Sequence, residues 1–213
     1  MPRVVLLLAA LAASLPAQRA PIIDNDQVRV LLVTDQPGRK TALHEHAMNR
    51  VMIYLDSGRQ TLRYADGRVE DIKFPPGEAR WSPAGGKHTS ENTGGKPFRV
   101  VEVELKGPGR PVTFGALDPV RLAPDMYKVV IDNPQVRVLH VRVGPNRSVP
   151  FHEHGLNRVV VFMTDVNLKV TDEGGNATAL TAKAGEVRWG GTAKHAEENL
   201  ASGEFEVVVV ELK

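Results

Sequence analysis

The chain contains an internal duplication, and this repeat constrains the fold more than any other feature. A segment that begins at Ile23 returns at Ile131, 108 positions later, and the two copies stay in step over most of their length. The matched segments are 23–31 with 131–139, His44-Glu45-His46 with His152-Glu153-His154, 49–51 with 157–159, 77–81 with 185–189, and Lys87-His88 with Lys194-His195. A repeat of this length is one folding unit, so two similar domains of roughly 85 residues are expected.

The repeat also sets the domain boundaries. We predict an N-terminal domain over residues 21–107, a linker over 108–125 and a C-terminal domain over 126–213. The linker is rich in proline, which removes backbone donors and ends regular structure, so we expect it to lie over the surface. Because one unit alone would bury only a marginal core, we expect the two domains to pack against each other.

Residues 1–17 resemble a secretory signal peptide. Arg3 gives a positive start, residues 4–13 are apolar, and Leu15-Pro16-Ala17 provides a cleavage site. The apolar run is too short for a membrane-spanning helix, which needs ~20 residues. We therefore predict a periplasmic or secreted protein with no membrane attachment after cleavage. The absence of cysteine excludes a lipid anchor on that residue and fits an exported protein without disulfides.

The charges are nearly balanced, with 27 Lys and Arg against 25 Asp and Glu. No basic stripe or aromatic-basic run is present, so nucleic acid is not an expected partner. Both units show short strands separated by turn signals such as Asp66-Gly67, with no helical period. Strands are expected at 27–33, 50–55, 60–64, 69–74, 78–82 and 98–105, and in the second unit at 135–143, 158–164, 166–170, 186–189 and 204–212. Some seven or eight short strands per unit predict an all-β antiparallel barrel or jelly roll.

Three histidines recur at matched positions in the two copies. They are His44, His46 and His88 in the first unit and His152, His154 and His195 in the second. Residues two apart on a strand point to the same side, so each His-x-His pair can reach one cation, and the later histidine can join them from a neighbouring strand. A lone histidine is more often a hydrogen-bonded residue than a ligand, but the third histidine and the duplication favour a metal site. His140 has no counterpart, because Leu32 holds that position, and it is given no role.

These motifs resemble those of the cupin superfamily. Gly77-x5-Pro83-x-Gly85-x2-His88-x3-Asn92 is similar to the second cupin signature, and His44-x-His46 is similar to the histidine part of the first. The second copy has Gly191 in place of Pro83 and is one residue shorter. The resemblance runs from about residue 21 to the end and is to a bicupin, a chain with two cupin domains. Small cupins named for beta-alanine degradation are also similar.

The resemblance implies a tandem pair of jelly-roll barrels, each holding a divalent transition metal (iron, manganese, nickel, copper or zinc) through histidines and usually a glutamate. It also implies either a monomer, in which the duplication supplies the usual pairing of barrels, or a homodimer. The chain departs from the pattern at the glutamate, where Arg50 and Arg158 stand. An arginine has only donors and cannot ligate a cation.

Three alternatives follow for the missing ligand. The site has three histidines and open positions, or a carboxylate comes from elsewhere, or the metal has been lost and the pocket binds another molecule. Glu104 and Glu211 are matched carboxylates, but their alternation with apolar residues favours a solvated outer face.

Other matched residues have simpler interpretations. Arg50 and Arg158 are candidate catalytic residues that could dock a substrate carboxylate, although a surface ion pair at a strand end is slightly favoured. We expect Glu45 and Glu153 to be exposed, Asn92 and Asn199 to fix the turn after the third histidine, and Trp81 and Trp189 to be core or pocket-wall residues.

Two classes of function remain open from the sequence. One is a metal-dependent oxygenase or isomerase that acts on a small organic acid. The other is a non-catalytic periplasmic cupin that binds a small molecule or uses the cation for structure.

Overall fold

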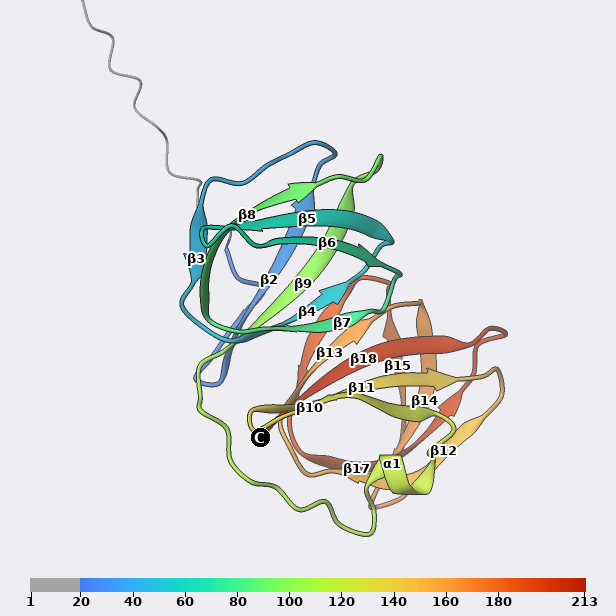
Figure 1. The fold of residues 1–213 in the computed structure, drawn as a ribbon. Coiled ribbons are helices and arrows are strands. Elements are labelled where there is room, and N and C mark those ends of the chain that lie inside the picture. The colour runs from blue at the N-terminus through green and yellow to red at the C-terminus, as the bar shows by residue number, and fades with distance from the viewer. Residues whose placement is uncertain (1–19) are drawn as a thin grey trace, which may run out of the picture.

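The computed structural model describes residues 20–213, which form two β-barrels connected by a linker (Figure 1). The predicted signal peptide at 1–17 lies outside the described residues. The N-terminal barrel comprises β1 (Ile23–Asp24), β2 (Val28–Asp35), β3 (His44–His46), β4 (Arg50–Tyr54), β5 (Gly58–Tyr64), β6 (Val69–Phe74), β7 (Ala79–Ser82), β8 (Gly85–Asn92) and β9 (Phe98–Leu105). The C-terminal barrel comprises β10 (Tyr127–Asp132), β11 (Val136–Val143), β12 (Ser148–His154), β13 (Arg158–Phe162), β14 (Val166–Asp172), β15 (Ala177–Ala182), β16 (Val187–Gly190), β17 (Ala193–Asn199) and β18 (Phe205–Leu212).

Each barrel is built from one five-stranded and one four-stranded sheet, and all strand pairs are antiparallel. The N-terminal orders are β1-β2-β9-β4-β7 and β3-β8-β5-β6, and the C-terminal orders are β10-β11-β18-β13-β16 and β12-β17-β14-β15. The two topologies are the same strand for strand, so the sequence repeat is a repeat of a complete sandwich. The prediction of an all-β fold with two tandem jelly-roll barrels is confirmed.

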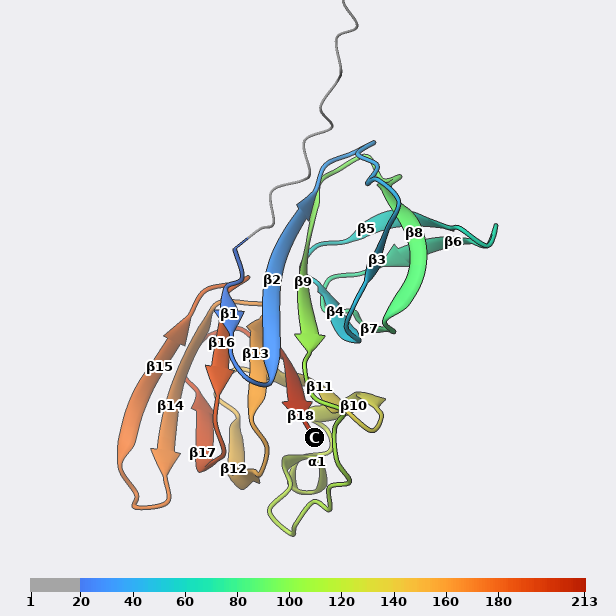
Figure 2. The same cartoon turned by 90° about the vertical axis from the view of Figure 1, so that its left-hand side faces the viewer.

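The two five-stranded sheets pack face to face and share one apolar core. Valines from β2, β4 and β9 meet valines from β11, β13 and β18, and Val51, Val103, Val159 and Val210 are among those with no exposed surface. The four-stranded sheets lie on the outer sides, with β14 and β15 on one side and β5 and β6 on the other (Figure 2). Packing of the two units against each other, expected from their small size, is therefore observed.

Hydrogen bonds across this interface are reciprocal. The Asn49 side-chain amide donates to the Gln135 side-chain oxygen at 2.6 Å, and the Asn157 amide donates to the Gln27 oxygen, also at 2.6 Å. Asn49 matches Asn157 in the repeat, and Gln27 matches Gln135. Each barrel thus presents the same patch to the other, which is the arrangement of a symmetric dimer built into one chain.

The linker packs on the C-terminal barrel more closely than expected. Its Gly109 has a φ of +81°, and a Cβ there would lie 2.1 Å from the Pro134 carbonyl oxygen, so only glycine fits against that turn. One helical turn, α1 (Pro119–Leu122), follows, with proline at its first position. The prediction that the linker lies over the surface without regular structure is therefore wrong for its second half, where Asp118 and Ala123 are buried.

Within the described residues, no helix is both long enough and apolar enough to cross a bilayer.

Candidate metal centres

The N-terminal barrel brings its three predicted histidines together. His44 lies opposite His88 in the β3–β8 ladder, and His46 points to the same side of β3 as His44. The ring centroids are 4.9 Å apart for His44 and His46, 4.7 Å for His44 and His88, and 5.5 Å for His46 and His88. One ring nitrogen from each histidine lies within 4.8 Å of the others, a spacing that a single cation can bridge.

The C-terminal barrel repeats this arrangement. His152 lies opposite His195 in the β12–β17 ladder, and His154 completes the group. The centroid distances from His152 are 4.9 Å to His154 and 4.6 Å to His195, and the Nε2 atoms of His152 and His154 are 3.2 Å apart. The group is more buried than its N-terminal counterpart, because His152 and His154 are both buried, whereas only His88 is buried in the first barrel.

Hydrogen bonds orient the rings toward the centre of each group. The Nδ1 atoms of His44, His88 and His152 lie 2.8, 2.6 and 2.8 Å from the carbonyl oxygens of Ala42, Gly86 and Pro150. A carbonyl only accepts, so each Nδ1 carries the proton and each Nε2 keeps its lone pair for a metal. The buried Nε2 of His195 has no hydrogen-bond partner. A buried nitrogen without a partner is costly, and a cation would satisfy it.

Burial keeps four of these imidazoles in the form that binds metal. It lowers the pKa of His152 to about 4 and that of His195 to about 3, and it also lowers the pKa of His88 and His154. These four rings are therefore neutral at neutral pH. Metal binding requires neutral imidazole, so no proton has to be removed first. The donor set, its spacing and its protonation all fit a divalent transition ion.

The expectation that Glu104 and Glu211 face solvent is wrong. Their exposed fractions are 8% and 1%, and both point into a barrel interior. The alternating residues of β9, such as Val103, face the other barrel, so this strand has no solvated side. In the N-terminal barrel, oxygens of Glu102 and Glu104 lie within 4.8 Å of a ring nitrogen of His46 and form a second possible ligand group with it. A carboxylate from elsewhere is thus within reach of this site.

In the C-terminal barrel the matched glutamate supports a histidine. A carboxylate oxygen of Glu211 lies 3.4 Å from Nδ1 of His154, and the other accepts a hydrogen bond from Nε of Arg137 at 2.6 Å. Burial alone would raise the pKa of Glu211, but these two hydrogen bonds outweigh it and the pKa is lowered. Asp118 of the linker binds Arg137 on its other side, at 2.9 and 3.0 Å. The chain of contacts therefore runs from the linker to a candidate metal ligand.

The N-terminal barrel lacks this support. The corresponding pair is Arg29 and Glu104, whose closest atoms are 3.7 Å apart, and Oε2 of Glu104 has no hydrogen-bond partner. Within the described residues, no linker carboxylate reaches Arg29. The two centres share their histidines but differ in the residues that hold those histidines in place.

The candidate arginines lie inside the barrels, so the interpretation as surface ion pairs is wrong. Arg50 is 5% exposed, and its Nη1 is 3.6 Å from a Glu102 oxygen. Its Nε and Nη1 make no hydrogen bond. Arg158 is partly buried and donates from Nη1 to the Gly191 carbonyl. Burial lowers the pKa of both guanidinium groups. Arg50 therefore has unsatisfied donors in the cavity that His88 lines.

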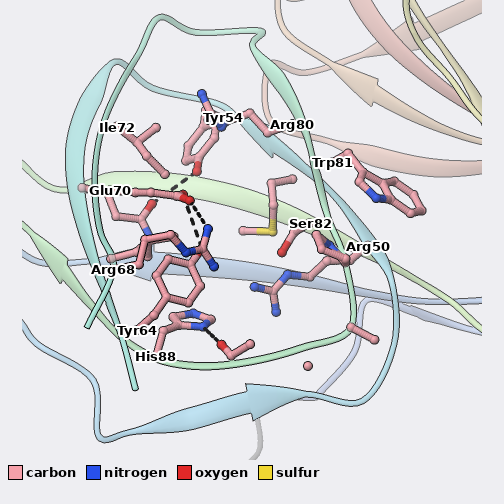
Figure 3. Close-up of a pocket in the computed structure, with 17 residues that line it drawn as sticks. Arg50, Tyr54, Tyr64, Arg68, Glu70, Ile72, Arg80, Trp81, Ser82 and His88 are labelled. Atoms are coloured by element: carbon pink, nitrogen blue, oxygen red, sulfur yellow. Dashed lines mark hydrogen bonds and ion pairs between the residues drawn. The ribbon is translucent and has the colours of Figure 1, made fainter. Parts of the chain in front are cut away.

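Each histidine group opens onto a cavity. The N-terminal cavity has a volume of about 240 Å³, and the guanidinium of Arg50 points into it near His88 (Figure 3). Arg68 lies over the Tyr64 ring at 3.7 Å and pairs with Glu70 at 2.6 Å along its wall. The C-terminal cavity has a volume of about 270 Å³ and is bordered by Arg158 and His195.

Glu197 was missed by the sequence analysis. It lines the C-terminal cavity, where it is partly buried, and an oxygen lies 3.4 Å from Nε2 of His195. Burial raises its pKa to about 7. Its counterpart in the first unit is Ser90, two residues after His88. An alignment of the two copies therefore shows a serine replaced by an acid, and this replacement was the signal that could have identified Glu197.

The remaining matched residues have structural roles. The prediction for Asn92 and Asn199 is confirmed, because the Asn92 amide binds the carbonyls of Asp35 and Lys96, and the Asn199 amide makes three such bonds. Trp81 packs on the shared core, and Trp189 lines the C-terminal cavity. Glu45 is exposed as expected, whereas Glu153 is half-buried. His140 pairs with Glu206 at 2.6 Å, close to Gly77 of the other barrel.

Comparison with known proteins agrees with this geometry. Residues 31–104 match the cupin domain family. The crystal structure of AerE from Microcystis aeruginosa is similar over 91% of this chain and 96% of that one, with 13% identity and a TM-score of 0.65. Oxalate decarboxylase from Bacillus subtilis at pH 4.6 is similar over 87% of this chain and 68% of that one, with 14% identity and a TM-score of 0.61.

A cupin 2 conserved barrel domain protein from Leptotrichia buccalis is similar over 91% of this chain and 87% of that one, with 12% identity and a TM-score of 0.57. At these identities the likeness is one of fold. No curated protein sequence matches the chain. The repeated histidine geometry, the family match and the shared fold lead to one conclusion: residues 31–104 form a cupin domain, and the C-terminal barrel repeats its fold.

Proposed function

We propose that this protein is an exported bicupin that holds one divalent transition ion in each barrel and acts on a small organic acid by metal-assisted oxidation or isomerisation. The observation that carries the proposal is the buried guanidinium of Arg50, which lines the same cavity as His88 and whose Nε and Nη1 have no hydrogen-bond partner. Buried donors without partners are costly, and a carboxylate would accept two parallel hydrogen bonds from this guanidinium, at least one of them from an unpartnered donor.

The residues of the site have separate roles in this proposal. The three histidines of each barrel hold the ion, which supplies Lewis-acid or redox chemistry when bound. Arg50 or Arg158 binds and orients the carboxylate of the substrate. The barrel walls keep bulk water from the reacting group, which strengthens these charge interactions.

Bacillus subtilis oxalate decarboxylase, which shares the fold, has Mn(II) centres, so manganese and oxalate are suitable first probes. The test is elemental analysis of protein purified without an affinity tag, followed by oxygen-uptake and product assays with a panel of small organic acids. Bound iron or manganese with turnover of an acid supports the enzyme. A tightly held ion that only raises the melting temperature, with no turnover, supports the non-catalytic alternative.

Export is tested on the full-length chain expressed in a Gram-negative host. The proposal expects the protein in the periplasmic fraction with the first 17 residues removed, as seen by intact mass. Full-length protein in the cytoplasm would contradict it. The internal pairing of the barrels supports a monomer, which light scattering can check against a homodimer.

A further inference from the structure

The interiors of the two barrels differ in polarity at matched positions. Tyr54 of the first barrel matches Phe162 of the second, because they lie opposite the equivalent residues Val100 and Val207. Gln60 likewise matches Leu168, opposite Asn92 and Asn199. Glu102 matches Val209, opposite Met52 and Val160. At each of these three positions the first barrel has a polar residue and the second an apolar one.

The polar residues of the first barrel form a hydrogen-bond network. The Tyr54 hydroxyl donates to Gln60 at 3.2 Å, and the Gln60 amide donates to Ser90 at 2.6 Å. Together with Arg50 and Arg68, these groups make the N-terminal cavity polar on several sides. A ligand there would have to match hydrogen-bonding groups around most of its surface.

The C-terminal cavity is different because, apart from Arg188, its charged groups are gathered around the histidines. Val141, Phe162, Leu168 and Val207 line it and are buried. Val170 and Leu180 extend the apolar wall. Two arginines line the cavity, but Arg188 pairs with Glu186 at 2.7 Å. Arg158, beside Glu197, and the cation that the histidines would hold are therefore the groups left to bind an anion. A ligand that fits therefore has one charged end and an apolar body.

We infer that the C-terminal barrel binds a monocarboxylic acid with an apolar body of roughly six to eight carbons, whereas the N-terminal barrel binds a smaller, more polar acid. This inference rests on the proposed function for its anionic end only. An apolar cavity of about 150 Å³ is enough for benzene. The C-terminal cavity of about 270 Å³ therefore has room for a ring or a short aliphatic chain together with the carboxylate.

The inference predicts how affinity depends on chain length. Each methylene that moves from water into an apolar cavity contributes about 0.8 kcal/mol, which corresponds to about a fourfold decrease in Kd. Butyrate, hexanoate and octanoate should bind with Kd values that fall by that factor per methylene. The matching alcohols should bind more weakly, because they lack the charge that Arg158 recognises.

The test is calorimetric titration of this series into the mature protein, both metal-free and manganese-loaded. Leu168→Gln introduces the residue of the N-terminal barrel, and Gln60→Leu is the matched control in the other direction. Phe162→Tyr adds a single hydroxyl and is the conservative variant in case Leu168→Gln does not fold. Arg158→Met and Arg50→Met identify the barrel that binds the carboxylate.

We expect Leu168→Gln and Phe162→Tyr to weaken octanoate binding by about tenfold while Gln60→Leu leaves it unchanged. In the metal-free protein, Arg158→Met should remove the preference for acid over alcohol, and Arg50→Met should keep it. A Kd that does not depend on chain length, or that responds to the N-terminal variants alone, would overturn the inference. Metal content is measured on the same samples, so a protein that binds octanoate but no metal contradicts the proposed function and leaves the inference standing.

Discussion

The carboxylate of Asp118 holds the guanidinium of Arg137 through two hydrogen bonds of 2.9 and 3.0 Å, and both side chains are buried. The Phe114 ring stacks on the same guanidinium at 3.3 Å from its centroid. Because Arg137 also binds Glu211, which faces His154, the linker fixes the position of a candidate metal ligand. Such supporting contacts set the orientation and basicity of metal-bound histidines.

Removing the charge of Asp118 should weaken metal binding in the C-terminal barrel. Asp118→Asn is predicted to lower the affinity of that site by about tenfold or more. The affinity is measured by competition with a chromophoric chelator in a His44→Ala background, where only the C-terminal site remains. Asp125→Asn is the control, because Asp125 pairs with Arg147 at the surface and should leave the affinity unchanged. Equal effects of the two variants would refute the role given to Asp118.

The metal-free protein should lose stability as the pH falls from 6.5 towards 4. Burial lowers the pKa of His152 to about 4 and of His195 to about 3 from an ordinary value of 6.5. Between these values the unfolded chain binds protons that the folded chain does not, so stability falls as the pH is lowered through this window and levels off below the folded-state values. Melting temperatures between pH 7 and 4 test this after chelation. A His152→Gln, His195→Gln double variant should show a shallower dependence, and an unchanged slope would count against the assignment.

The shared core should make the two barrels unfold together. Ile53 is fully buried in that core, and Ile53→Ala is predicted to destabilise the protein by about 2–5 kcal/mol. Val69→Ala, at a half-exposed position on β6, should change stability by no more than about 0.5 kcal/mol. Denaturant unfolding is followed by circular dichroism and by tryptophan fluorescence, since Trp81 and Trp189 report on one barrel each. A transition in which only the Trp81 signal shifts would show that the barrels are independent.

Arg50 should contribute to acid binding without contributing to metal binding. Arg50→Met keeps most of the length of the side chain and removes its charge. Loss of charge-assisted hydrogen bonds of about 1.5–3 kcal/mol predicts a decrease of about 10- to 150-fold in affinity for oxalate or malonate. Elemental analysis should still find the metal of the wild-type protein. If oxalate binds the variant as well as the wild type, the docking role of Arg50 is wrong.

The sequence predicted the fold and the histidine groups well because both follow from spacing. A repeat of 108 residues and the His-x-His alternation survive divergence, and they place His44, His46 and His88 without knowledge of the contacts. The ends of β6 and β9 were predicted to the residue. In contrast, β8 and β17 were not among the expected strands. Their residues are mostly polar because they line a site, so they lack the apolar alternation by which strands are recognised.

The errors concern residues whose environment depends on distant parts of the chain. The alternation around Glu104 and Glu211 is typical of a strand with one solvated face, but here the valine face packs on the other barrel and the glutamate face lines the interior of its own barrel. Asp118 lies in a proline-rich segment, and nothing in the local sequence shows that this segment folds back on Arg137. Arg50 was expected at the surface because its only recognisable feature was its place at a strand end.

Metal stoichiometry tests the central claim most directly. We predict two equivalents of a divalent transition metal per wild-type chain, one equivalent in His44→Ala, one in His152→Ala and none in the double variant, with all four proteins folded by circular dichroism. Wild-type protein that binds no metal after reconstitution, or single variants that keep both equivalents, would contradict the account.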